Sequence, residues 1–366
     1  MKNVRIVIGS SYGDEGKGNA TNYLATDRSA VVRFNGGAQA GHTVEHDGIR
    51  HVFHNFGSGT LKGVPTILGP KFAIDPIMFF WEAESLPHDL INKLKVFADP
   101  ACPIVTPYDI ILNQAIERKR DDKHGSCGMG FGETIRRNIM GYEFTLKDAA
   151  NAENMCDSIE SWYFRPRVSE LGLNINDDEL MDMLDVFYTE LQSLTTHVET
   201  VAFKDIEDEF EALVFEGAQG LCLDQHSKDY PHVTFSNTGL DNVVELLDPR
   251  RHKLDVHYIT RPYLTRHGAG ELKDECEKPE GVVDETNIDN EFQGSLRFAP
   301  LNLDRMRRDI QNDLVKANRF EFDVKLMITC CDQVETDHQA IADAVGIENY
   351  ETCWSAAGDW RAACVT

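Results

Sequence analysis

The residues with the clearest chemical potential form one short segment near the N-terminus. Gly13-Asp14-Glu15-Gly16-Lys17-Gly18 directly follows an apolar run. Glycines in such a turn let backbone N–H groups approach an anion, and Lys17 would then lie beside a terminal phosphate. The segment is not a Walker A loop, because that pattern requires glycine at Ser11 and a hydroxyl residue at Gly18. Asp14 would replace the missing hydroxyl as a magnesium ligand. The segment predicts a nucleotide triphosphate site; a plain glycine-rich turn with a surface lysine is the alternative.

Four short apolar runs are the elements that would position this segment. Residues 4–8, 30–34, 213–215 and 324–328 have the composition of buried strands, and each ends in a glycine-rich or polar loop. Residues 19–26 predict a helix after the first loop. Strands separated by helical segments predict an α/β fold with a mostly parallel central sheet and surrounding helices. Ligands collect at the carboxyl ends of the strands in such sheets, which is where these loops lie.

The middle of the chain has a different pattern. Residues 146–164 and 176–195 carry Leu, Met and Phe at helical spacing, and we expect these helices to cover the sheet. Residues 205–211 and 273–291 are acidic, which favours solvated loops. No internal repeat or low-complexity linker divides the chain. Residues 1–366 are therefore interpreted as a single domain with helical and loop excursions.

The overall charge excludes one large class of function. Lys and Arg number 36 against 61 Asp and Glu, which gives a net charge of −25. A protein that coats nucleic acid needs cations at each phosphate, so no nucleic-acid partner is expected. No apolar stretch approaches the roughly 20 residues of a membrane-spanning helix, so no membrane partner is expected. The nine cysteines lack a CxxC pair and zinc-site spacing, which favours reduced thiols in a cytoplasmic protein.

Further segments, in a fixed order, make the glycine-rich loop more specific. They are residues 36–43 (Gly-Gly-Ala-Gln-Ala-Gly-His-Thr), 215–220 (Phe-Glu-Gly-Ala-Gln-Gly), 230–238 (Tyr-Pro-His-Val-Thr-Phe-Ser-Asn-Thr), 265–270 (Thr-Arg-His-Gly-Ala-Gly) and 290–292 (Asn-Glu-Phe). Together with the first loop they resemble the adenylosuccinate synthetase family over most of the chain. The resemblance implies that family's fold, which is related to P-loop nucleoside triphosphatases, and a ligase that forms a C–N bond.

The resemblance also implies a reaction. Such enzymes join L-aspartate to C6 of a 6-oxopurine nucleotide, driven by a nucleoside triphosphate with Mg²⁺. Asp14 would be the general base at N1 and, with the Gly41 carbonyl, a magnesium ligand. His42 would be the general acid at the transferring phosphoryl group, Gln219 would hold the purine edge, and Lys17 would neutralise the β- and γ-phosphates. Without the family, His42 would be interpreted as a satisfied loop histidine and Gln219 as a turn residue.

The family pattern assigns binding residues as well. The triphosphate would contact Gly13, Glu15, Gly16, Lys17, Gly18, Gly41, His42, Thr43, Asp332, Gln333 and Ser355. The purine monophosphate would contact Ser11, Asp14, Gln39, Ser126, Cys127, Arg137, Gln219 and Thr234, with Ser126, Cys127 and Thr234 at the 5′-phosphate. Arg136 or Arg137 falls where a neighbouring subunit's arginine reaches that phosphate, which implies a homodimer. Gly294, Ser295 and Arg297 would grip the carboxylates of L-aspartate.

The departures from the family cluster around the substrates, whereas the residues of phosphoryl transfer remain. They lie at Asn19, Asn22, Ala38-Gln39, Ser126-Cys127, Cys330-Cys331 and Arg297. Arg297 is the one arginine left in the loop that is predicted to hold L-aspartate. A lysine that normally packs on guanine is absent, which predicts ATP as the phosphoryl donor. The pattern resembles the compact phage branch that condenses dGMP with aspartate to 2-amino-2′-deoxy-N6-succinyladenylate, and dGMP is the first prediction. A compact IMP-using synthetase and a non-catalytic nucleotide-binding regulatory protein are the alternatives.

Overall fold

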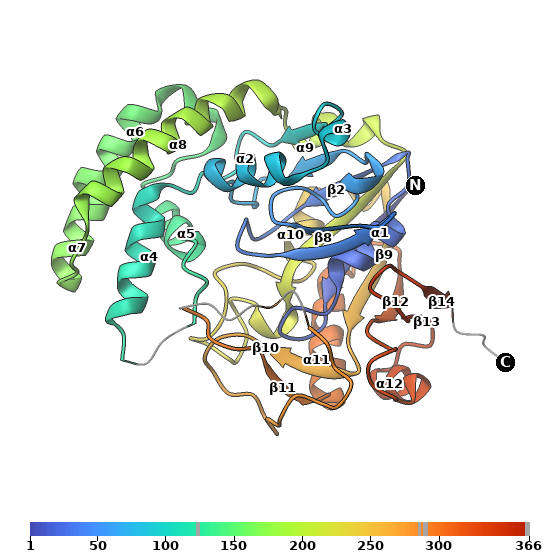
Figure 1. Ribbon diagram of the computed structural model, residues 1–366. Coiled ribbons are helices and arrows are strands. Elements are labelled where there is room, and N and C mark those ends of the chain that lie inside the picture. The colour runs from blue at the N-terminus through green and yellow to red at the C-terminus, as the bar shows by residue number, and fades with distance from the viewer. Residues whose placement is uncertain (122–124, 285–286, 288–291, 363–366) are drawn as a thin grey trace.

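A ten-stranded sheet runs through the molecule in the order β14-β13-β12-β9-β1-β8-β2-β5-β6-β7 (Figure 1). The computed structural model describes residues 1–121, 125–284, 287 and 292–362. The sheet strands are β1 (Lys2–Gly9), β2 (Ser29–Arg33), β5 (Thr66–Leu68), β6 (Val96–Ala98), β7 (Glu199–Thr200), β8 (Ala212–Gly220), β9 (His252–Thr260), β12 (Phe322–Ile328), β13 (Tyr350–Cys353) and β14 (Trp360–Ala362). Only β13 and β14 pair in antiparallel fashion among these described strands, so the predicted mostly parallel sheet is confirmed.

Two small hairpins and twelve α-helices complete the described part of the chain. The hairpins pair β3 (His42–His46) with β4 (Ile49–Phe53) and β10 (Tyr263–Arg266) with β11 (Arg297–Pro300). The helices are α1 (Lys17–Leu24), α2 (Pro76–Ser85), α3 (His88–Ile91), α4 (Pro107–Lys119), α5 (Phe131–Ile139), α6 (Ala152–Ile159), α7 (Arg165–Leu171), α8 (Asp177–His197), α9 (Phe203–Ile206), α10 (Asp241–Leu246), α11 (Leu303–Leu314) and α12 (His338–Val345).

The central strand β1 shows why the sheet forms. Val4, Ile6 and Ile8 pack into the core that α10, α11 and α12 cover, whereas Val7 packs on the opposite face with α1. Successive side chains of a strand point to opposite faces, so a run that is apolar at nearly every position is buried on both. β1 pairs with β8 on one side and β9 on the other. The four apolar runs predicted from the sequence correspond to β1, β2, β8 and β12.

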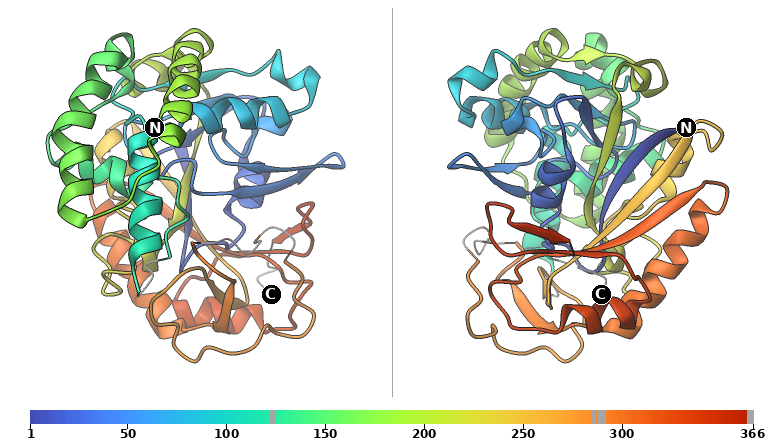
Figure 2. Two further views of the ribbon diagram at one scale, coloured as in Figure 1. Left: turned by 60° about the vertical axis from the view of Figure 1, so that its left-hand side comes forward. Right: turned by 90° about the vertical axis from the view of Figure 1, so that its right-hand side faces the viewer.

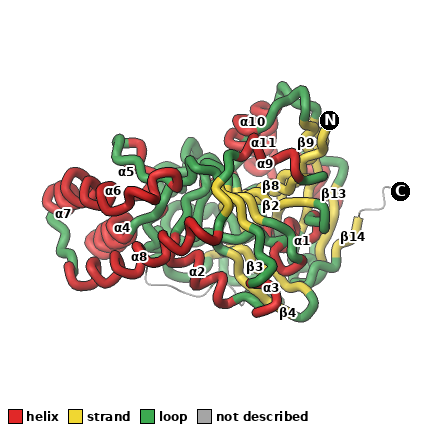
Figure 3. The backbone as a smooth tube through the Cα atoms, turned by 90° about the horizontal axis from the view of Figure 1, so that it is seen from above, coloured by secondary structure: helices red, strands yellow, loops and turns green. Residues whose placement is uncertain are grey.

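The helices of the middle segment correct one expectation. Leu184, Phe187 and Leu191 of α8 belong to a separate apolar cluster that includes residues of α2 and α4. Figure 3 shows α4, α6, α7 and α8 grouped beside the strands rather than over them, and in both views of Figure 2 the green helices α6–α8 lie above the red and orange ones. Their apolar stripes are therefore satisfied mainly by neighbouring helices, which a periodicity argument does not distinguish from packing on a sheet.

Two acidic segments gave different outcomes. Residues 205–211 were expected to be a solvated loop, yet α9 and a short 3₁₀ turn lie there, and Glu207 is buried. Its carboxylate lies 3.1 Å from Nη1 of the half-exposed Arg251 and 3.2 Å from Nε2 of His252, so the sequence pattern missed a buried carboxylate with partners distant in the sequence. The other predicted loop, residues 273–291, has no helix or strand at residues 273–284 and 287, and residues 285, 286 and 288–291 lie outside the described residues.

Candidate functional site

The loops that carry the predicted residues meet at one edge of the sheet. β2, β8, β1, β9 and β12 are consecutive parallel neighbours, so their carboxyl ends face the same way. The hydroxyl of Thr329, just after β12, donates to the carbonyl of Glu15 over 2.7 Å, and Asn35, just after β2, donates to the carbonyl of Asn237 over 2.9 Å. The structure therefore brings the predicted loops together where parallel sheets bind ligands.

Glu15 organises the glycine-rich loop from inside. One oxygen of its carboxylate accepts hydrogen bonds from the backbone N–H groups of Ser11, at 2.9 Å, and Gly13, at 3.0 Å. Gly9 and Gly220, which are register partners on β1 and β8, make room for it: a Cβ at Gly9 would lie 2.4 Å from Oε2, and one at Gly220 would lie 2.8 Å from Oε1. Glu15, expected to contact a triphosphate, instead points into the protein and acts as an internal anion.

Lys17 is held by that same carboxylate. Its Nζ lies 2.9 Å from Oε2 of Glu15, and both side chains are nearly inaccessible to solvent. Lys17, predicted to lie beside a phosphate, is thus paired within the chain. The ion pair would have to loosen before Lys17 could neutralise a β- or γ-phosphate. A buried cation without its anion is costly, so the bound phosphate would have to replace Glu15 as the partner.

The remaining loop glycines are required by packing. Gly16 has a φ of 88° and a Cβ there would lie 2.9 Å from the methyl of Thr329, while a Cβ at Gly18 would lie 2.9 Å from the carbonyl of Thr43. The left-handed conformation at Gly16 lets α1 begin at Lys17, two residues earlier than the predicted helix. α1 therefore starts inside the loop, with its N-terminal N–H groups beside the candidate anion site.

Asp14 and Gln219 have the same unusual backbone conformation. Their φ angles are 60° and 63°, and the Oε1 atom of Gln219 approaches Gly13 closely enough to lie 3.5 Å from a Cβ placed there. Non-glycine residues rarely adopt positive φ, and such strain is concentrated at functional sites. Oδ2 of Asp14 lies 3.7 Å from Nε2 of His267, a neighbour that the sequence analysis did not single out. Sequence reasoning had only the position of His267 in residues 265–270 as a signal.

His42 lies at the start of β3 and is almost completely buried. Its Nδ1 donates to Oε1 of Glu216 over 2.7 Å, and Ser58 donates to the same carboxylate through its hydroxyl and, over 3.0 Å, its backbone N–H. Burial alone would raise the pKa of Glu216, but His42, Arg33 and Ser58 lower it to about 2, so Glu216 is ionised. The sequence analysis quoted Glu216 only as part of a motif and missed this contact.

The segments predicted to bind the purine monophosphate also lie together. A Cβ at Gly125 would lie 2.5 Å from the Cα of Gly268, and one at Gly132 would lie 3.3 Å from the ring of Phe235. Residues 125–132 therefore contact the loops formed by residues 265–270 and 230–238. Within them, the hydroxyl of Ser126 accepts from Asn113 over 2.9 Å.

Cys127 and Thr234 lie in the same group of loops. Burial raises the pKa of the Cys127 thiol to about 11, so the thiol stays neutral. The backbone N–H of Thr234 donates to the carbonyl of Leu223 over 2.9 Å, which holds the loop after β8 in place.

Gln39 carries a buried side-chain amide at the edge of the candidate site. Both polar atoms of its side-chain amide are buried, and neither has a hydrogen-bond partner among the described residues. Leaving a buried amide unpaired costs on the order of 1–3 kcal/mol, so such a group normally has a partner when the protein is functional. Gln39 follows β2 on the same loop as Gly36 and Gly37. A Cβ added at either glycine would lie within 3.4 Å of that amide. The amide is thus pre-placed for a polar ligand.

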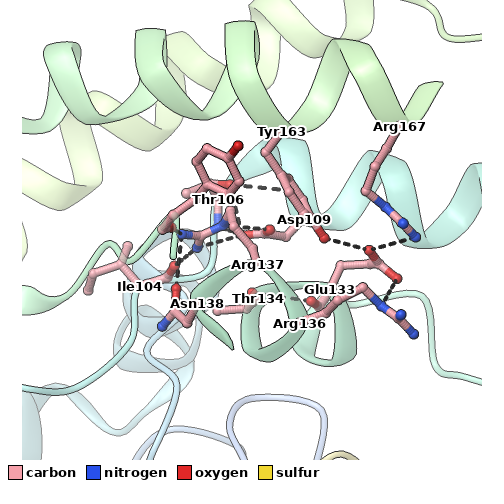
Figure 4. Close-up of polar contacts among 12 residues, drawn as sticks. Ile104, Thr106, Asp109, Glu133, Thr134, Arg136, Arg137, Asn138, Tyr163 and Arg167 are labelled. Carbon is pink, nitrogen blue, oxygen red and sulfur yellow. Dashed lines mark hydrogen bonds and ion pairs between the residues drawn. The ribbon is translucent and has the colours of Figure 1, made fainter. Parts of the chain in front are cut away.

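Arg137 does not occupy the position expected for it. Its guanidinium is fully buried and makes five hydrogen bonds within the chain, two of them to Asp109 at 2.9 and 3.0 Å (Figure 4). The structure thereby corrects the assignment of Arg137 as a phosphate ligand or an arm toward a neighbouring subunit. Arg136, the other candidate, is partly exposed, lies 3.4 Å from Glu133 and stacks on Phe235.

Arg297 is occupied by groups of its own chain. Its Nη1 donates to the carbonyls of Gly268 and Gly270 over 3.1 and 2.9 Å, and its other edge binds the carboxylate of Glu275, with Nε at 2.9 Å from Oε1. Glu275 lies where a substrate carboxylate would bind such a guanidinium. Ser295 is exposed, and Gly294 has a φ of 69° with open space around it.

The predicted residues of the donor base lie in loops that follow β12 and β13. Asn19 of α1 donates to the carbonyl of Ser355 over 3.4 Å and to that of Ala356 over 2.8 Å, so the Ser355 loop is fastened to the helix that follows the glycine-rich loop. Asp332 is exposed. The side chain of Gln333 is engaged by Tyr263 and by the carbonyl of Val283, which leaves Asp332 as the more accessible of the two.

Asp14 and the Gly41 carbonyl are the ligands that the sequence analysis predicts for Mg²⁺. The carboxylate is partly exposed, and Gly41 lies on the exposed rim of the site. The described residues contain no group of three or more His, Cys, Asp or Glu side chains that could hold a metal. Mg²⁺ is commonly held by one or two protein oxygens with phosphate and water completing its octahedron, and these residues fit that pattern. When bound, the ion would neutralise charge on the phosphates.

Comparison with known proteins decides the family. The family model described as "Adenylosuccinate synthetase" matches residues 6–294. The chain belongs to the adenylosuccinate synthetase family. These enzymes are ligases that form C–N bonds. The adenylosuccinate synthetase of Nitrosococcus oceani is 31% identical over 77% of this chain and 67% of its own length, and that of Borrelia duttonii is 33% identical over 63% and 55%. This chain therefore matches between about half and two thirds of these relatives.

Two solved structures share the fold. The fully ligated adenylosuccinate synthetase of Plasmodium falciparum has a TM-score of 0.72 and 22% identity, with 96% of this chain and 80% of that chain covered. The succinoaminodeoxyadenylate synthetase of cyanophage S-2L, solved with dGMP and with dATP as an energy donor, has a TM-score of 0.67 and 16% identity, with 99% and 95% covered. The expected α/β fold is thus confirmed. No helix among the described residues is long and apolar enough to span a membrane.

Proposed function

We propose that this adenylosuccinate synthetase-family ligase condenses L-aspartate with C6 of dGMP, using ATP, to give 2-amino-2′-deoxy-N6-succinyladenylate. The observation that carries the proposal is the retention of Asp14, Lys17, His42 and Gln219 at one sheet edge, while the residues expected around the purine, the donor base and aspartate differ from the family pattern. Guanine has the same N1–H and C6=O groups as hypoxanthine. The chemistry therefore transfers without a new catalytic group.

The proposed reaction has two steps. Asp14 takes the proton from N1, and the electron pair moves to O6, which attacks the γ-phosphorus of ATP while the bond to the β-phosphate oxygen breaks. His42 is the general acid at the transferring phosphoryl group. The amine of aspartate then attacks C6, and the C6–O6 bond breaks with release of phosphate. O6 of the nucleotide leaves in the phosphate, and ADP is the other product.

The polar groups of the site support binding of the purine monophosphate. The buried amide of Gln39 lacks a partner within the described residues, and the loops of Ser126 and Thr234 lie beside the same edge. Arg136 is the arginine that remains accessible, so in the proposed homodimer it, rather than Arg137, would reach the phosphate of the neighbouring subunit. A guanidinium suits that task because it binds phosphate bidentately.

IMP is the second candidate substrate. The curated relatives described above are named adenylosuccinate synthetase, including those at 31% and 33% identity, and this favours the ordinary purine. The 2-amino group is the difference: a site without an acceptor for it would leave a buried amine unpaired, at a cost on the order of 1–3 kcal/mol. Such a cost is large enough to decide which of the two purines reacts.

A substrate matrix tests the proposal. Purified protein is assayed with Mg²⁺ and L-aspartate, and with each of dGMP, GMP and IMP against ATP and GTP, by purine absorbance and phosphate release. We expect the highest kcat/KM for dGMP with ATP. Turnover of IMP without dGMP would support the second candidate, and no turnover in any combination would support a non-catalytic nucleotide-binding role. With ¹⁸O at C6, the label must appear in the released phosphate.

A further inference from the structure

A buried polar cluster lies directly behind His42. Glu216, on β8, is in register with Arg33 on β2, and the side chains of both residues are inaccessible to solvent. Ser58 and His42 approach Glu216 from the segments that follow β4 and β2. A carboxylate removed from water in this way is tolerated only when donors satisfy its lone pairs.

Hydrogen bonds fix how the cluster is protonated. Oε2 of Glu216 accepts from the backbone N–H of Ser58 over 3.0 Å, and Oε1 accepts from the hydroxyl of Ser58 and from Nδ1 of His42, the latter over 2.7 Å. An ionised carboxylate only accepts, so Nδ1 must carry a hydrogen. Nε2 is then the one ring nitrogen of His42 that is left to act on a ligand.

We propose that Glu216 is a positioning residue for His42: it fixes the ring and keeps a hydrogen on Nδ1, so that any proton delivered by His42 comes from Nε2. This inference rests on the proposed function, in which His42 acts at the transferring phosphoryl group. The hydrogen bond from Nδ1 to the carboxylate holds the ring in one orientation, so that Nε2 can give or take a proton without rotation of the ring.

A purely structural role as counter-ion of Arg33 explains the contacts less well. Nη1 of Arg33 donates to the carbonyl of Phe56 over 3.0 Å, and the guanidinium lies over the ring of Phe72. Nε and Nη2 of Arg33 have no hydrogen-bond partner among the described residues. The hydrogen bonds described for Glu216 thus go to His42 and Ser58, and the attraction of Arg33 stabilises the charge at longer range.

The substitution Glu216→Gln tests the idea because the surroundings dictate the orientation of the new amide. The N–H of Ser58 requires an oxygen at the Oε2 position, so the amide nitrogen must take the Oε1 position and face Nδ1 of His42. The amide then donates to Nδ1, and the hydrogen of the neutral ring moves to Nε2. Such a ring could release that hydrogen only as an imidazolate, so delivery of the proton is blocked.

Glu82→Gln is the matched control. Glu82 is also a buried carboxylate close to Arg33, but it accepts from the backbone N–H groups of His54, Asn55 and Phe56 and has no described hydrogen bond to His42. The control makes the same chemical change at another buried carboxylate that influences Arg33. Loss of stability from a buried amide would therefore appear in both variants, whereas an effect on the His42 ring would appear in one.

The experiment combines nitrogen NMR with kinetics. Protein labelled with ¹⁵N-histidine is compared with its His42→Asn variant, which assigns His42 among the 13 histidines. We expect an Nδ1–H ring in the wild type and in Glu82→Gln, and an Nε2–H ring in Glu216→Gln. With the substrate that wild type turns over best, kcat of Glu216→Gln should fall by about 100-fold or more relative to Glu82→Gln, with KM of the purine nucleotide little changed.

Two results would overturn the inference. One is an Nε2–H ring in the wild type, which needs no variant and so decides the matter even if Glu216→Gln does not fold. The other is a kcat of Glu216→Gln equal to that of Glu82→Gln. If the wild type turns over no purine nucleotide at all, the proposed function fails, and the tautomer comparison still decides whether Glu216 positions His42.

Discussion

Replacing Glu275 by Gln should strengthen the apparent binding of L-aspartate. The carboxylate of Glu275 occupies Arg297, the guanidinium proposed to hold a substrate carboxylate. Aspartate must therefore displace it. The pair is partly exposed, at 25% for Arg297 and 43% for Glu275, and exposed ion pairs of this kind contribute about 0.2–1 kcal/mol. Removal of the competing charge should lower KM for aspartate by about 1.4- to 5-fold.

The assay is initial rate against aspartate concentration with both nucleotides saturating. Glu211→Gln is the control, because Glu211 pairs with Arg28 at the surface and is not among the predicted site residues. We expect an unchanged KM in the control and an unchanged kcat in both variants. A KM for aspartate that rises in Glu275→Gln would refute the reasoning, since it would show that Glu275 supports the bound geometry of Arg297 instead of competing for it.

Three further outcomes are expected. Asp14→Asn should abolish turnover while calorimetry still detects binding of dGMP; near-normal activity would remove Asp14 as the base. Arg137→Met should lower the free energy of unfolding by about 3–5 kcal/mol in urea titrations, because Asp109 is left buried and unpaired, and Arg136→Met by less than about 1 kcal/mol. Burial raises the pKa of Asp75 from its usual 3.8 to about 6, so folding is penalised by about 3 kcal/mol once pH exceeds both values. Asp75→Asn, measured between pH 4 and pH 7, should remove that fall in stability with rising pH, and an unchanged pH profile would contradict the shift.

Local patterns predicted four of the ten described strands of the sheet and the place of the site. The runs that became β1, β2, β8 and β12 are apolar at consecutive positions, and only strands buried on both faces need such a pattern. The order of short motifs along the chain identified the family before any contact was known. The motifs that follow β1, β2 and β8 end strands that run in parallel, so their meeting at one edge follows from the topology.

Partners distant in the sequence could not be predicted in the same way. The buried carboxylate of Glu207 lies beside Arg251 and His252. The apolar residues of α8 pack in one cluster with residues of α2 and α4. Arg137 looked as accessible as Arg136 because adjacent residues of a helix share their local composition. Only the packing of α5 against α4 placed one guanidinium on Asp109 and left the other near the surface.

The sequence by itself determined which chemical groups this ligase carries and the order in which its strands and loops carry them along the chain. Both can be recognised from residues that are neighbours in the sequence. The tertiary structure decided which charges are already matched inside the chain. Lys17 with Glu15, Arg297 with Glu275 and His42 with Glu216 all pair within hydrogen-bond distance. The energy of a charge depends on its distance from other charges and from water, and only the folded chain sets those distances.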